Sequence, residues 1–162
     1  MDNLLILGAG QYGQLIKELA QQSGKYEKIE FLDDYNECAI GKLDDYLKYT
    51  ENFSHAIVSF GDINLRKKWV GIIKQYFVLP IVSYSAYVSP SAKIGSNVVI
   101  EPFAVVHSSC NIGDGCLISS GAVINHNSTI NSFCNIDCNA TVGARSVIEE
   151  YSVIKTNDSE VK

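Results

Sequence analysis

The chain of 162 residues lacks several features that would place it in a common protein class. It has no run of 18 apolar residues, and it begins with the strand-like segment LLILGAG at 4–10 instead of a charged region followed by an apolar stretch. We therefore expect neither a transmembrane span nor a secretory signal peptide. An excess of basic residues is also missing. The net charge of −5 disfavours binding to nucleic acid or to an anionic membrane surface.

Metal-binding patterns are absent as well. The sequence has five cysteines but no CxxC pair and no Cys/His pair at zinc spacing, so no metal site is expected. An odd number of cysteines without a secretory signal favours free thiols in a reducing cytoplasm. The five cysteines are Cys38, Cys110, Cys116, Cys134 and Cys138.

What the sequence does contain is a six-residue repeat from residue 88 to about residue 159. Every sixth residue is Val or Ile, twelve times in succession and without insertion. The residue two places earlier is usually small, and the residue after each Val or Ile is usually small, polar or Gly, as at Gly95 and Gly113. The twelve are Val88, Ile94, Ile100, Val106, Ile112, Ile118, Ile124, Ile130, Ile136, Val142, Ile148 and Ile154.

A period of six fits neither an amphipathic α-helix nor a long alternating strand. It fits very short strands joined by sharp corners, with β-branched residues buried and Gly or Asn supplying the positive φ that tight corners need. Three hexads make one triangular coil of about 18 residues, so the repeat predicts about four stacked coils around a column of Val and Ile. Cys110, Cys116 and Cys134 fall at the small inward position and are interpreted as packing residues.

Residues 1–80 follow a different pattern. Apolar runs at 4–7, 29–32 and 56–60 predict three strands, and helical patterns follow at about 14–23 and 63–76. Alternation of strands and helices predicts a small parallel sheet with crossover helices, a Rossmann-like α/β domain.

A glycine motif follows the first predicted strand. Residues 8–13, GAGQYG, match GxGxxG between strand and helix, and Asp33 lies 20 residues after Gly13. Backbone N–H groups at a helix N-terminus attract phosphate. Because about 80 residues is half of a full dinucleotide domain, a mononucleotide or nucleotide-sugar fits better than NAD. The alternative is that the glycines serve only tight strand–helix packing.

Taken together, five segments resemble the NeuD/PglD-type family of bacterial sugar acyltransferases, nearly over the whole chain and in order. They are LGAGQYG at 7–13, FLDD at 31–34, SFGDINLRKK at 59–68, YVSPSAKIGSNVVI at 87–100 and SSGAVINHN at 119–127.

The resemblance implies a left-handed parallel β-helix of hexapeptide repeats at 81–162, and a nucleotide-sugar-binding domain at 1–80. It implies transfer of an acetyl group from acetyl-CoA to an amine or hydroxyl of a nucleotide-linked sugar for surface glycans. It also implies a homotrimer with active sites between neighbouring helices. The residues that it assigns to the nucleotide-sugar are Gly8, Gly10, Gln11, Tyr12, Gly13, Asp33, Asp34 and Ser119.

Acetyl transfer requires a base, because the attacking amine or hydroxyl loses a proton, and histidine suits this role at neutral pH. Of the three histidines, His55 lies outside the repeat, whereas His107 and His126 lie within it. His126 matches the family's catalytic histidine, and we predict that it is the base. His107 is interpreted as a solvent-facing corner residue.

The sequence departs from the family at several positions. The neighbours of His126, Asn125 and Asn127, are neutral where the family commonly has an acid. An Asn carbonyl can fix the tautomer of the imidazole but supplies no charge, so Asn125, Asn127 and the nearest downstream acid, Asp137, are the candidates to support His126. Asn135 stands where some members have a second histidine. The hexad pattern stops near Lys155, which predicts a short helix in which the acyl-CoA site is completed by a neighbouring subunit or is degraded. The residues assigned to acetyl-CoA are Asn135, Gly143 and Ala144.

Three alternatives remain open. The chain could be a weakened nucleotide-sugar-binding or scaffold subunit, as the missing acid and the short helix suggest. It could be an NAD-dependent oxidoreductase, on the glycine loop alone. A γ-type carbonic anhydrase also uses this helix, but it needs three histidines on zinc and the repeat has only two.

Overall fold

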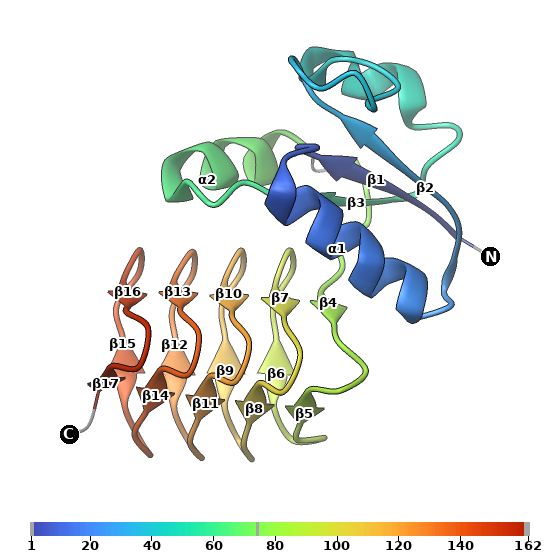
Figure 1. Cartoon of the computed structure of the whole chain (residues 1–162). Helices are drawn as coiled ribbons and strands as arrows, with labels where there is room; N and C mark the ends of the chain where they lie inside the picture. Colours follow the sequence, from blue (N-terminus) through green and yellow to red (C-terminus); the bar gives the residue numbers. More distant parts are fainter. Residues whose placement is uncertain (1, 74, 161–162) are drawn as a thin grey trace. The chain divides into compact units, whose positions relative to one another are not determined.

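The computed structural model describes residues 2–73 and 75–160 (Figure 1). The chain divides into two compact units, residues 1–79 and residues 80–162, which are described separately. None of the helices within the described ranges is long and apolar enough to cross a membrane.

The N-terminal unit is built on a three-stranded parallel sheet in the order β2-β1-β3. The strands are β1 Asp2–Leu7, β2 Tyr26–Leu32 and β3 His55–Val58. Their connections are α1 Gln11–Gln22, the 3₁₀ helix η1 Leu43–Tyr49 and, after β3, α2 Ile63–Ile72. This confirms the predicted small α/β domain.

Side-chain alternation along β1 divides the core of this unit between the two faces of the sheet. Leu5 and Leu7 pack in one cluster with Trp69 of α2 and the following Ile73. Leu4 and Ile6 are equally buried and point to the opposite face. The sheet is therefore covered on both sides, which is typical of a parallel sheet.

Helix α1 begins three residues earlier than the sequence pattern predicted. It starts at Gln11, with Gly10 as its N-cap, so Gly13 lies inside the first turn of the helix instead of before it. The prediction placed the start at about residue 14, after the last glycine, and glycine is a poor helix former. Tertiary packing overrides that preference, since Gly13 lies directly against the backbone of Gly8, which follows β1.

The C-terminal unit is a left-handed parallel β-helix, as predicted, whose two-residue strands stack in three sheets (Figure 1). Sheet 1 contains β4 Ile81–Val82, β7 Val99–Ile100, β10 Leu117–Ile118, β13 Asn135–Ile136 and β16 Val153–Ile154. Sheet 2 contains β5 Tyr87–Val88, β8 Val105–Val106, β11 Val123–Ile124, β14 Thr141–Val142 and β17 Ser159–Glu160. Sheet 3 contains β6 Lys93–Ile94, β9 Asn111–Ile112, β12 Thr129–Ile130 and β15 Val147–Ile148.

The register of the strand pairs in the helix is 18 residues, as the three-hexad coil predicted. Leu117 pairs with Asn135, for example, and Ile118 with Ile136. The second residue of most strands points inward, and these Val and Ile side chains form one continuous core with the small residues, including Cys110, Cys116 and Cys134. Full burial of each such side chain contributes roughly 1.5–3 kcal/mol, so the column dominates the stability of this unit.

The helix continues past both ends of the Val/Ile column, within the bounds 81–162 that the family resemblance implied. Strand β4 pairs with β7 before Val88, and β17 pairs with β14 after Lys155. The polar segment at 156–160 joins the helix because strand pairing uses backbone groups: Thr141 N donates to Asp158 O and Gly143 N donates to Glu160 O. Side-chain pattern alone could not show this pairing.

The corners of the helix from residue 97 onwards contain residues with positive φ, which are also six apart. Eleven consecutive positions from residue 97 to residue 157 have this conformation, and most are not glycine. The conformation turns the N–H of such a residue towards the preceding coil, so that Asn127 N donates to Ser108 O and Arg145 N donates to His126 O. The other corner residues with positive φ are Asn97, Phe103, Ser109, Gly115, Gly121, Phe133, Asn139, Tyr151 and Asn157.

The glycines that follow Val or Ile serve a different purpose from the one predicted. Gly95 and Gly113 do not have positive φ; the left-handed position lies two residues later. A Cβ on Gly113 would lie 2.7 Å from Ser132 N in the next coil, and one on Gly95 would lie 2.8 Å from Asp114 N. These glycines are required because the backbones of adjacent coils approach closely there.

The substitution Gly113→Ala tests this reason. The added methyl group meets backbone that cannot move aside, so we expect a loss of about 1–3 kcal/mol in the free energy of unfolding, measured by urea denaturation. Ser109→Ala is the control, because Ser109 is exposed; its change should stay within about 0.5 kcal/mol. Equal stability of the two variants would contradict the explanation.

Candidate functional site

Packing requires two of the glycines in the loop between β1 and α1. Gly8 has φ of +108°, and a Cβ there would lie 2.5 Å from Ser59 Oγ. A Cβ on Gly13 would lie 2.1 Å from Gly8 O. Ser59 Oγ in turn lies 2.9 Å from Leu7 O and 2.8 Å from Gly8 O, within donating distance of both carbonyls at the end of β1. The packing interpretation of the motif therefore holds for Gly8 and Gly13.

Gly10 is different. Its φ of −68° is ordinary, and a Cβ built there meets nothing within 4 Å. It borders an open cavity of about 500 Å³ at the N-terminus of α1, together with Asp33, Tyr35, Asn36 and Glu37. The fold alone does not require glycine at this position, so a close-approaching ligand is a sufficient reason for it.

Asp33 ties the glycine loop to the turn that follows β2. Its Oδ2 accepts a hydrogen bond from Ala9 N at 2.7 Å, and its Oδ1 accepts from Tyr35 N and Asn36 N at 2.9 and 3.0 Å. Asn36 Nδ2 also donates to Ala9 O at 2.8 Å. Partial burial acts to raise the pKa of Asp33, but these backbone N–H groups outweigh it and lower the pKa below its ordinary value.

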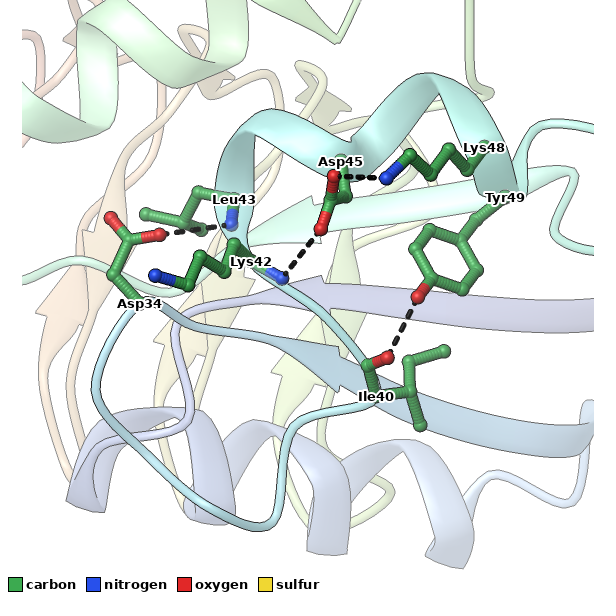
Figure 2. A network of polar contacts seen from close by, with 7 residues as sticks. All are labelled: Asp34, Ile40, Lys42, Leu43, Asp45, Lys48 and Tyr49. Atoms are coloured by element: carbon green, nitrogen blue, oxygen red, sulfur yellow. Dashed lines mark hydrogen bonds and ion pairs between the residues drawn. The ribbon is translucent and has the colours of Figure 1, made fainter.

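Asp34 caps the next element. Figure 2 shows its Oδ1 accepting from Leu43 N at 3.1 Å, at the start of η1. The same segment is held by Lys48 Nζ, which donates to Asp45 Oδ1 at 2.6 Å, and by Tyr49 OH, which donates to Ile40 O at 2.7 Å. The FLDD motif thus has a structural role at both of its carboxylates.

A second cavity, of about 400 Å³, shares Asp33 and Tyr35 with the first and has an aromatic and aliphatic wall. The Tyr35 side chain is exposed (95%) although its backbone is held by Asp33. A cavity with such an apolar wall beside a helix N-terminus is suited to a base or sugar ring next to a phosphate. The other lining residues are Asp34, Leu43, Asp44, Phe60, Leu65, Lys68 and Trp69.

The segment SFGDINLRKK forms the loop from β3 into α2. Asp62 is the N-cap of α2, and its Oδ1 accepts from Leu65 N at 2.7 Å. The fully buried Arg66 donates from one guanidinium nitrogen to Phe60 O at 2.7 Å and to Gly61 O at 3.1 Å. This buried cation fixes the loop that carries Phe60 to the second cavity.

His126 lies in the β-helix at the corner between β11 and β12, where it is half-buried. Its Nδ1 is 2.9 Å from Oδ1 of Asn127. Because the amide oxygen can only accept, Nδ1 is the donor in this contact, and in the neutral imidazole with this tautomer Nε2 is the acceptor. Asn127 is thus the residue that orients the imidazole. Within the described residues, Nε2 has no hydrogen-bonding partner.

The corner of His126 belongs to one edge of sheet 2, which we call the histidine edge, residues 107–110, 125–128 and 143–146. Here the structure brings together several predicted residues on successive coils. Asn125 Nδ2 donates to Val142 O at 3.1 Å, and Ser128 Oγ donates to Gly143 O at 2.8 Å. Gly143 and Ala144 lie one coil above Asn125 and His126, because the coil length is 18 residues.

The structure separates Ser119 and Asp137 from His126 within one chain. Both lie on the other edge of sheet 2, which we call the acidic edge, residues 101–104, 119–122, 137–140 and 155–158. Asp137 follows Ser119 by one coil, and Ser119 N donates to Ile136 O at 2.9 Å. The expected role of Asp137 as orienter of His126 in the same chain is therefore filled by Asn127. Asn135 lies on β13 in sheet 1, two residues before Asp137.

Three residues escaped the sequence interpretation. Asn36 anchors the glycine loop, Tyr35 lines both cavities, and Arg145 lies one coil above Asn127 on the histidine edge. Nothing in the sequence pattern distinguishes them, because each acts through a neighbour that is distant in sequence. Across residues 2–73 and 75–160, no group of three or more His, Cys, Asp or Glu side chains could hold a metal ion.

The hydrogen bonds that Asp33 accepts make the free energy of unfolding depend on pH. A carboxylate with a lowered pKa stabilises the folded state above its unfolded pKa of about 4, and that contribution is lost as pH falls through the folded pKa. We expect Asp33→Asn to lower the free energy of unfolding by about 1 kcal/mol at pH 7, with the difference shrinking below about pH 4 in urea titrations. The exposed Glu37→Gln is the control; a difference from wild type independent of pH for Asp33→Asn would refute the charge-based explanation.

Comparison with known families matches both units. Residues 3–73 match the PglD N-terminal domain, and residues 91–126 match the bacterial transferase hexapeptide family (six repeats). A comparison with curated proteins finds no match.

Several solved structures share the fold. The acetyltransferase domain of PglB from Neisseria gonorrhoeae FA1090 in complex with acetyl coenzyme A is 24% identical, with a TM-score of 0.84, covering 97% of this chain and 83% of that one. A mutant of perosamine N-acetyltransferase from Caulobacter crescentus in complex with CoA and GDP-perosamine is 19% identical, with a TM-score of 0.84 and coverage of 100% and 90%. WeeI from Acinetobacter baumannii AYE is 17% identical, with a TM-score of 0.77 and coverage of 100% and 92%.

The two domain matches occur in the predicted order, and the fold agrees with them along nearly the whole chain. The resemblance seen in the sequence is therefore confirmed: the N-terminal unit matches the PglD N-terminal domain, and the repeat matches the bacterial transferase hexapeptide family.

Proposed function

We propose that this protein transfers an acetyl group from acetyl-CoA to an amine or hydroxyl of a nucleotide-linked sugar. The observation that carries the proposal is the state of His126. Asn127 holds its Nδ1, which leaves the lone pair of Nε2 on an accessible corner of the helix. A neutral imidazole with one oriented, accepting nitrogen is what a general base requires.

The reaction balances with this one base. Nε2 of His126 takes the proton from the acceptor as its nitrogen or oxygen attacks the thioester carbonyl. The C–S bond then breaks, and the departing CoA thiolate regains a proton from the imidazolium. No acyl-enzyme intermediate is needed. Cys110, Cys116 and Cys134, which a covalent route might have used, are buried in the core.

The N-terminal unit supports binding of the nucleotide part. Gly10 borders the cavity at the N-terminus of α1, where a phosphate is favoured, and the adjoining cavity has the apolar wall that a base or sugar ring requires. Asp33 accepts three backbone N–H groups, so it acts on the ligand through the loop that it fixes. This engagement disfavours the NAD-dependent alternative, in which that carboxylate binds ribose hydroxyls.

Acetyl-CoA is proposed as the acyl donor on the strength of the family and of the solved relatives that contain acetyl-CoA or CoA. Gly143 and Ala144 lie one coil above His126, in a position to border a thioester held at that corner. Asn135 is the weaker candidate, because it lies on another sheet. We further propose a cytoplasmic homotrimer that acts in bacterial surface-glycan biosynthesis.

Replacement of His126 tests the chemistry. We expect His126→Ala to lower kcat by about 10²- to 10⁴-fold with little change in KM or thermal stability, measured with acetyl-CoA and a panel of nucleotide-amino sugars. His107→Ala is the matched control on the preceding coil and should keep near-wild-type kcat. Equal turnover by wild type and His126→Ala would remove His126 from the mechanism, whereas sugar binding without turnover in the wild type would favour the scaffold alternative.

Replacement of Asn127 tests the orienting group. Asn127→Asp keeps the left-handed backbone accessible and adds the acid that the family commonly has. A negative charge beside the imidazole favours its protonated form, so the acid limb of the pH profile of kcat/KM should move to higher pH. Asn127→Ser, which adds no charge, serves as the control; an unchanged acid limb in Asn127→Asp would contradict contact between residue 127 and the catalytic base.

Gly10 tests the nucleotide site without disturbing the fold. A methyl group at Gly10 meets no protein atom within 4 Å, so Gly10→Ala should leave the melting temperature unchanged while weakening nucleotide-sugar binding about tenfold in calorimetry. Gly13→Ala is the contrasting variant and should lower the melting temperature. Full affinity in Gly10→Ala would place the nucleotide elsewhere.

A further inference from the structure

The histidine edge presents positive charge beside His126. Arg145 occupies the corner position of Asn127 one coil later, and its backbone N donates to His126 O at 3.0 Å. Its side chain is exposed, and among the described residues its guanidinium forms neither an ion pair nor a hydrogen bond. The other titratable group of this edge, His107, packs edge-on against Tyr87 and is positively charged when protonated. The corner therefore holds one permanent cation.

Carboxylates are absent from this edge. Over residues 101–158, the acidic side chains lie at the other two corners of the β-helix. Glu160 follows on β17, nearly two coils above His126. The histidine edge is thus the one corner of these coils that offers no anion to a bound cation. The carboxylates at the other corners are Glu101, Asp137 and Asp158 on the acidic edge, and Asp114, Glu149 and Glu150 between sheets 3 and 1.

The amine and the hydroxyl that the proposed function allows as acceptors differ in charge at neutral pH. An alkyl amine has a pKa of about 8 to 10, so it carries a proton and a positive charge at pH 7. A sugar hydroxyl is neutral. At a separation of about 7 Å and an effective dielectric constant of about 20, repulsion between two cations weakens binding more than about tenfold. Arg145 therefore disfavours an ammonium group at Nε2 of His126 and leaves a hydroxyl unaffected.

The number of protons to be removed points to the same acceptor. An ammonium group must lose one proton before its nitrogen can attack and a second as the amide forms, whereas a hydroxyl loses only one. His126 accepts a single proton, at Nε2, because its Nδ1 donates to Asn127 Oδ1. The histidine edge has no carboxylate that could hold an ammonium group while it loses the first proton. One base without an anion is sufficient for a hydroxyl.

We propose that the acceptor is a sugar hydroxyl, that the product is an acetyl ester, and that Arg145 is the residue that selects this acceptor. The inference rests on the proposed acetyl transfer and defines its acceptor. Nε2 of His126 takes the hydroxyl proton as the oxygen bonds to the thioester carbonyl carbon. The C–S bond then breaks, and the CoA thiolate regains the proton from the imidazolium. The guanidinium of Arg145 stabilises the negative charge that develops on the reacting oxygens.

Matched acceptors test the preference for a hydroxyl. Pairs of UDP- and GDP-linked hexoses are used that differ only in an amine or a hydroxyl at one carbon. With acetyl-CoA at pH 7, the hydroxyl member of the accepted pair should react with a kcat/KM about tenfold higher. Neutral hydroxylamine should then release the acetyl group from the product, because it cleaves esters and leaves amides intact. A main product that resists hydroxylamine overturns the inference.

Charge reversal tests the role of Arg145. This residue has φ of +60°, a conformation that Asp and Asn accept. In Arg145→Asp, the ratio of kcat/KM for the amine to that for the hydroxyl should rise about tenfold to a hundredfold, and Arg145→Asn should give a smaller rise. The control Lys155→Asp makes the same change in net charge on the acidic edge and should leave the ratio unchanged. An unchanged ratio in Arg145→Asp, or an equal rise in Lys155→Asp, overturns selection by Arg145.

Binding in the absence of acetyl-CoA separates this inference from the proposed function. In calorimetry at pH 7, the amine should bind the wild type about tenfold more weakly than its hydroxyl partner. The difference should shrink as pH rises through the pKa of the amine, because the neutral amine is not repelled. Equal affinities at pH 7 overturn the inference even if the enzyme is active. A preference for the hydroxyl in a protein that acetylates neither acceptor supports selection by Arg145 and refutes the proposed chemistry.

Discussion

The backbone ladder between successive coils is the interaction on which the C-terminal unit depends. Strand N–H groups donate to the carbonyls of the next coil, as Val123 N does to Ala140 O, and corner N–H groups donate to the preceding coil, as Asn127 N does to Ser108 O. The corners reach the preceding coil through residues with positive φ. Unsatisfied buried backbone groups cost more than the strain of a left-handed residue, so bulky Phe133 and Tyr151 are tolerated there.

This ladder also decides where chemistry can occur. The inward positions are filled by Val, Ile and small residues, and the strands are only two residues long, so functional side chains must lie at corners or on outward strand positions. His126 occupies a corner whose carbonyl is held by Arg145 N. The corner gives the imidazole a rigid base and an open approach, a combination that general base catalysis requires.

The N-terminal unit uses a different means to build a rigid site. A loop rich in glycine would be disordered by itself, but Asp33 and Asn36 hold both the N–H and the carbonyl of Ala9. The carboxylate of Asp33, which the sequence assigned to the nucleotide-sugar, instead holds the backbone of the loop. The fold therefore requires glycine at two positions of the motif, Gly8 and Gly13. It does not require glycine at Gly10.

The sequence by itself determined the α/β unit, the β-helix, its 18-residue coil and the burial of three cysteines, because a period of six with Val or Ile at every repeat is compatible with one backbone geometry. It also singled out His126 and named Asn125, Asn127 and Asp137 as possible support; only the corner geometry shows that the amide of Asn127 lies at Nδ1. Strands β4 and β17 lie within the predicted bounds 81–162, but their pairing could not be read from the Val/Ile column, since backbone pairing leaves no side-chain pattern. Tertiary structure alone decided that Asp33 binds backbone and that Asp137 and His126 lie on opposite edges of one sheet, because both depend on groups far apart in sequence.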